Sequence, residues 1–100
     1  MTDHPTFGVE EEFLLVDPDT GAPVPLNRPV ADRAARGGVD LQLELTSCQV
    51  ETTSSVTSSR AELSAELARL RGVTAEAAVD SGARLLAVAL PPTEIGRAHV

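Results

Sequence analysis

The stretch GVEEEFLLVD, residues 8 to 17, decides the fold of this chain. Apolar side chains recur at alternate positions through it, with the two-residue period of a β-strand. The pattern predicts a strand over residues 7–16. Its core face carries Phe7, Val9, Phe13 and Leu15.

Three consecutive carboxylates, Glu10, Glu11 and Glu12, stand at the start of this strand. Side chains two apart on a strand point the same way, so Glu10 and Glu12 share a face. Two carboxylates about 7 Å apart repel by roughly 2 kcal/mol at an effective dielectric near 20. Burial beside Leu14 and Val16 would therefore need protonation, basic neighbours or a cation. Mg²⁺ suits such a site because it takes oxygen ligands.

A second acidic segment follows in DLQLELTSCQVETTS, residues 40–54. Two further strands are predicted there, with Glu44 and Glu51 each on the polar side of its own strand. Neighbouring strands could bring these two carboxylates to Glu10 and Glu12. The alternative is that Glu10 and Glu12 form the solvated face of an edge strand. Glu11 falls on the apolar face, where we expect it to reach the sheet edge or to meet an arginine such as Arg60 or Arg84.

Other elements follow from turn and cap chemistry. Asp17 to Gly21 predicts a turn, and residues 22–25 a ragged hairpin return. A short helix is predicted over residues 29–36, ended by two glycines. A long helix begins at a capping box of Ser59 and Glu62 and ends at Ser81-Gly82, with a kink or close packing expected at Gly72.

After the long helix, residues 84–90 predict a strand buried on both faces. The predicted order is strand, hairpin piece, helix, two strands, helix, strand. The fold class is therefore α+β, with a largely antiparallel sheet and helices on one face.

Composition sets further limits. The chain has 100 residues, 42% of them apolar, and a formal net charge of −7. It holds one domain or part of one, and its acidity argues against nucleic acid or an anionic membrane as a partner. The single cysteine excludes an internal disulfide, and the longest apolar run is too short to span a bilayer. With no secretory signal at the N-terminus, a cytoplasmic location is expected.

Three segments together resemble one family. TFGVEEEFLLVDPDTG at 6–21, ELTSCQVETTS at 44–54 and GARLLAVALPPT at 82–93 are similar to the opening of the carboxylate–amine ligases known as glutamate–cysteine ligase type 2. The resemblance implies a glutamine synthetase-like domain, whose curved antiparallel sheet binds ATP and Mg²⁺ on its concave face. It also implies that the metal ligands are Glu10, Glu12 and Glu51. Glu44 matches a further acidic position of the family, which is a less specific sign of a metal ligand.

The reaction implied by the resemblance joins glutamate to cysteine through a γ-glutamyl phosphate, with ADP and phosphate released. Such activity is weak in this branch, whose substrates are small molecules, and the parent enzyme could be a homo-oligomer. Residues 1–93 would be the N-terminal part of the catalytic domain, inactive alone. Residues 94–100 (EIGRAHV) resemble a translated sequencing adapter and are expected to be non-native. The competing interpretations are a small acidic Mg²⁺-binding module and a structural module without catalysis.

Overall fold

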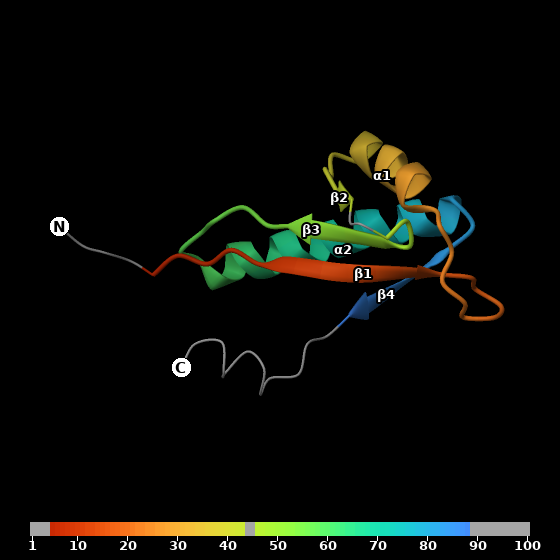
Figure 1. Cartoon of the computed structure of the whole chain (residues 1–100). Helices are drawn as coiled ribbons and strands as arrows, with labels where there is room; N and C mark the ends of the chain where they lie inside the picture. The colour runs from red at the N-terminus through yellow and green to blue at the C-terminus, as the bar shows by residue number, and fades with distance from the viewer. Residues whose placement is uncertain (1–4, 44–45, 89–100) are drawn as a thin grey trace, which may run out of the picture.

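The computed structural model describes residues 5–43 and 46–88, and these form a four-stranded antiparallel sheet with two helices (Figure 1). The elements in chain order are β1 (Glu10–Val16), α1 (Asn27–Arg36), β2 (Gln42–Leu43), β3 (Gln49–Thr53), α2 (Arg60–Asp80) and β4 (Arg84–Val88). The predicted α+β class is confirmed. The long helix begins and ends at the predicted residues, whereas α1 begins two residues earlier than expected.

The first strand lies inside the sheet, whose order is β2-β3-β1-β4. β1 pairs antiparallel with β3 on one side and with β4 on the other. The expected hairpin return over residues 22–25 is reduced to an isolated bridge between Val16 and Pro23. Pro23 has no backbone N–H to donate, which limits a ladder at that point.

One face of the sheet is covered by helices, and the core lies between them. In Figure 1, α2 runs behind the strands, and α1 packs against the C-terminal half of α2, where Gly37 lies close to Val73. Leu15 and Val50 of the sheet are fully buried in one cluster with Val30 of α1 and Ala78 of α2. Both helices therefore belong to one core, as the sequence pattern indicates.

The long helix begins at its predicted cap, although half of the capping box is different. The Ser59 hydroxyl accepts a hydrogen bond from the Glu62 amide at 3.2 Å. The Glu62 carboxylate does not return to the Ser59 amide but accepts from the Thr57 hydroxyl at 2.7 Å. Among the described residues, no helix is long and apolar enough to cross a membrane.

The last strand differs from the prediction of full burial over residues 84–90. β4 lies at the edge of the sheet that the described residues form, and Leu86 and Val88 are 44% and 41% exposed on the face away from the helices. The prediction was wrong because an apolar run does not reveal whether another layer covers each face of the strand. Residues 89 and 90 lie outside the described ranges.

Two glycines allow a matched test of helix packing. A Cβ built on Gly37 would lie 2.7 Å from Cγ1 of Val73, so this glycine lets the end of α1 approach α2. Gly37→Ala should lower the free energy of unfolding by about 1–3 kcal/mol through overpacking. Gly72 lies within α2 and its Cβ would meet nothing within 4 Å, so the expected close packing there is wrong.

Gly72→Ala is the control, because it adds the same methyl group without a clash. It should raise the free energy of unfolding by up to about 1 kcal/mol through helix propensity. Denaturant unfolding monitored by circular dichroism measures both variants. Equal effects of the two substitutions would contradict the close approach of α1 and α2.

Candidate functional site

The sheet register brings the predicted carboxylates onto one face. Glu12 of β1 lies directly opposite Glu51 of β3 in the antiparallel ladder. Directly opposed residues point to the same side, with Cβ atoms about 4.5–5.5 Å apart. Glu10, two residues before Glu12, shares that face and lies opposite Thr53. Glu10, Glu12 and Glu51 therefore face one direction, which is the arrangement that the ligand roles implied by the family resemblance require.

The two central acids belong to a row that crosses the whole described sheet. The row runs from Gln42 of β2 through Glu51 and Glu12 to Val88 of β4. It lies on the face that α1 and α2 leave uncovered, where Glu12 and Glu51 are half-buried. The carboxylates thus occupy the open side of the sheet, away from the aliphatic core.

Polar neighbours on the same face add further oxygen atoms. Gln42 adjoins Glu51, and Thr53 adjoins Glu10 across the ladder. Sequence reasoning missed both residues because only the register places them beside the acids. Carboxylate, amide and hydroxyl oxygens are hard donors, and this donor chemistry fits Mg²⁺. In the ranges 5–43 and 46–88, no three His, Cys, Asp or Glu side chains already lie close enough to hold a metal ion.

Glu44, the fourth predicted ligand, lies outside the described residues. The metal-ligand roles of Glu10, Glu12, Glu51 and Glu44 remain predictions. The geometric condition that they require, a shared face for the acids of β1 and β3, is present.

Glu11 points to the opposite face and has a different partner from those expected. Its carboxylate accepts two hydrogen bonds of 2.8 Å from the Nε and a terminal nitrogen of Arg71. This bidentate pair raises the pKa of Arg71, chiefly through the hydrogen bond and then through the charge of Glu11. The expectation of Arg60 or Arg84 as the partner was wrong. The packing of α2 on the sheet decides which turn of the helix lies over β1, and the sequence pattern does not show this packing. Glu11 therefore ties the sheet to α2 and stands apart from the acidic face.

The hydroxyl-rich segment after β3 holds the chain in place. The Ser54 hydroxyl accepts from the Val9 amide at 2.8 Å, next to the start of β1. The Ser55 amide donates to the Glu66 carboxylate of α2, and this bond lowers the pKa of Glu66. These contacts hold β1, β3 and the start of α2 in place relative to one another. They therefore also fix the position of Glu10 at the start of β1.

The chain matches one known family. The sequence profile described as Glutamate-cysteine ligase family 2 (GCS2) matches residues 6–100. That range includes both acidic strands, the two helices and β4.

Curated relatives carry names from the same family. A protein of Mycobacterium sp. (strain KMS) named "Putative glutamate--cysteine ligase 2-2" is 68% identical over 93 residues, which cover 93% of this chain and 26% of that protein. "Putative glutamate--cysteine ligase 2-3" of Mycolicibacterium smegmatis is 61% identical over 93 residues, which cover 93% of this chain and 26% of that protein. "Putative glutamate--cysteine ligase 2-1" of Nocardia farcinica is 57% identical over 91% of this chain and 24% of its own length.

The chain thus spans about a quarter of the length of these relatives. The family match covers more than nine-tenths of its residues. The chain belongs to the glutamate–cysteine ligase family 2.

Proposed function

We propose that this chain is the N-terminal part of an ATP-dependent ligase that joins the γ-carboxylate of glutamate to the amine of cysteine. Membership of the family and the names of its relatives support this reaction class. The observation that carries the proposal is the register of β1 against β3, which sets Glu12 opposite Glu51 with Glu10 beside them. The full-length protein that carries this segment is called the parent protein below.

The reaction has two transfers. An oxygen of the γ-carboxylate of glutamate attacks the terminal phosphorus of ATP, and the bond from phosphorus to ADP breaks. The amine nitrogen of cysteine then attacks the acyl carbon, the bond to phosphate breaks, and the amine loses a proton. Products are γ-glutamylcysteine, ADP and phosphate.

Glu10, Glu12 and Glu51 would hold Mg²⁺, with Glu44 as a further proposed ligand. The bound ion supplies charge that neutralises the phosphates during phosphoryl transfer. The chain contributes a rigid platform, because the three acids stand on two hydrogen-bonded strands rather than on loops. On the opposite face, the Glu11–Arg71 pair holds β1 against α2.

This chain spans about a quarter of its relatives' length and would provide one wall of such a site. The groups that hold the nucleotide and the two amino acids are proposed to lie in the rest of the parent protein, so the segment alone is expected to be inactive. The parent protein is proposed to act in the cytoplasm, where ATP is available.

Product formation by the parent protein tests the proposal. Incubation with ATP, Mg²⁺, glutamate and cysteine should release phosphate and yield a product with the mass of γ-glutamylcysteine. Omission of glutamate should abolish phosphate release, and chelation of the metal should do so until Mg²⁺ is restored. A purified, folded parent protein that releases no phosphate with glutamate and any amino acid amine would contradict the ligase and favour a non-catalytic acidic module.

A further inference from the structure

The antiparallel ladder that aligns the proposed metal ligands changes its register just beyond Glu10. Its last regular pair is Glu10 with Thr53. Farther out, Phe7 and Thr57 pair through two backbone hydrogen bonds of 2.7 and 3.0 Å. From one pair to the other, the strand that leads into β1 covers three positions (10 to 7) and the strand that leaves β3 covers four (53 to 57). The second strand therefore carries one extra residue, which makes a β-bulge.

Ser54 stands where the two registers meet. Its amide donates to the Val9 carbonyl at 2.9 Å, as in a regular ladder. In a regular pair of this kind the Val9 amide would donate in return to the Ser54 carbonyl. Here the Val9 amide donates to the Ser54 hydroxyl at 2.8 Å. The side chain of Ser54 thus takes the place of a backbone acceptor at the bulge.

Contacts inside this chain hold the Ser54 hydroxyl. Ser54 is only 6% exposed, and its hydroxyl donates to the Ser55 carbonyl at 3.1 Å while it accepts from Val9. The Ser55 amide in turn donates to the Glu66 carboxylate of α2. Because this chain itself buries Ser54, the arrangement does not depend on which surfaces the rest of the parent protein covers.

The place at which the register changes matters for the acids. Moving a strand by one residue turns its side chains to the other face of the sheet. If the outer register extended into the sheet, Glu12 would lie opposite Thr52 instead of Glu51. The Ser54 hydroxyl closes the inner register next to Glu10, before the change begins.

We propose that Ser54 is a positioning residue for the metal site, which holds Glu10 in line with Glu12 and Glu51 by closing the ladder at Val9. This inference rests on the proposed function, in which the three acids hold Mg²⁺. The groups of a binding site have to stay within about 0.5 Å of their productive positions. Without the Ser54 hydroxyl the Val9 amide loses its acceptor, and the strand next to Glu10 can open or slip.

Binding of Mn²⁺ to the parent protein tests this role. Mn²⁺ takes the same oxygen ligands as Mg²⁺, and electron paramagnetic resonance measures its free concentration without substrates. Ser54→Ala should weaken Mn²⁺ binding about tenfold, a loss typical of removing a group that orients a metal ligand. Ser54→Thr keeps a hydroxyl at this position and should restore most of the affinity.

Ser59→Ala is the matched control, because it removes another hydroxyl that accepts an amide hydrogen bond in the same segment. The Ser59 hydroxyl accepts from the Glu62 amide and caps α2. Its removal should lower the melting temperature, as Ser54→Ala does, and leave the affinity for Mn²⁺ unchanged. Equal weakening of Mn²⁺ binding in both variants would show that the hydroxyls act through general stability.

Hydrogen exchange of the wild type tests the same inference if Ser54→Ala does not fold. Mass spectrometry with fragmentation to single residues follows the Val9 amide in the parent protein. Mn²⁺ should slow its exchange, because an ion on Glu10 and the bond from Val9 to Ser54 order the same stretch of backbone.

Four outcomes overturn the proposal. They are a folded Ser54→Ala variant with wild-type affinity for Mn²⁺, equal losses of affinity at Ser54 and Ser59, exchange at Val9 that Mn²⁺ does not change, and a wild type that binds no Mn²⁺. Binding is measured without turnover. A parent protein whose Mn²⁺ binding depends on Ser54, but which forms no γ-glutamylcysteine, would therefore contradict the ligase alone.

Discussion

Glu12→Gln in the parent protein should lower turnover by about a hundredfold or more. Glutamine keeps the size of the side chain and removes the charge that Glu12 contributes opposite Glu51. A catalytic metal ion stabilises charge in the transition state by several kcal/mol, and each 1.4 kcal/mol is about a factor of ten in rate. Glu10→Gln and Glu51→Gln should show losses of the same order. Steady-state release of phosphate at several Mg²⁺ concentrations measures both turnover and the metal requirement, which should rise.

Glu11→Gln is the matched control for this prediction. It removes a charge from the same triplet but on the opposite face, where Glu11 binds Arg71. It should lower the melting temperature and leave turnover and the Mg²⁺ requirement unchanged. Equal losses of turnover at Glu11 and Glu12 would show that the acids act through the fold rather than through a metal.

Leu15→Ala should lower the free energy of unfolding by about 2–5 kcal/mol. Leu15 is fully buried in the cluster that joins the sheet to both helices, so truncation leaves a cavity that close-packed neighbours cannot fill. Denaturant unfolding of the parent protein measures the loss.

Val79→Ala is the control for this core substitution. Val79 lies on α2 with 68% of its surface exposed, and its truncation should change stability by no more than about 0.5 kcal/mol. A loss below about 1 kcal/mol at Leu15 would contradict its place at the centre of the core.

Local chemistry made much of the fold predictable from the sequence. Alternating apolar residues located β1, although it begins at Glu10 rather than at residue 7. The Ser59 hydroxyl marked the start of α2, because a cap acts within one turn of chain. The shared face of Glu10 and Glu12 follows from the pleat of a single strand.

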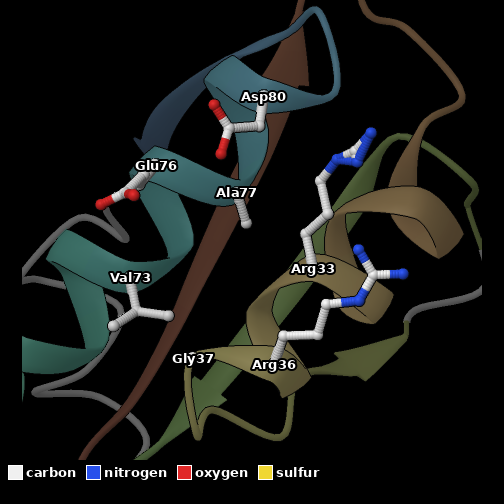
Figure 2. A pocket seen from close by; sticks show the side chains of 7 residues that line it. All are labelled: Arg33, Arg36, Gly37, Val73, Glu76, Ala77 and Asp80. Atoms are coloured by element: carbon white, nitrogen blue, oxygen red, sulfur yellow. The ribbon is translucent and has the colours of Figure 1, made fainter.

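Contacts between segments that are distant in the chain could not be predicted from these local patterns. The pairing of Glu12 with Glu51 depends on the register of two strands separated by α1 and β2. The partner of Glu11 depends on which turn of α2 lies over β1. The exposure of Leu86 depends on the open face of the described sheet having no helix over it. The groove between α1 and α2 that Arg33 and Glu76 line (Figure 2) arises only where the two helices meet, so neither helix alone indicates it.

The position of β1 inside the sheet also affects the chain during its synthesis. The ribosome releases β1 before its two sheet neighbours, because β3 begins at residue 49 and β4 at residue 84. Through that interval Phe13 and Leu15 are exposed on a nascent strand that has two open edges, the condition under which chains aggregate. The like charges of Glu10, Glu11 and Glu12 at the start of this strand repel the same segment of another chain, and so they oppose aggregation. The glutamates of β1, which lie in the middle of the finished sheet, would thus first protect the nascent chain from aggregation.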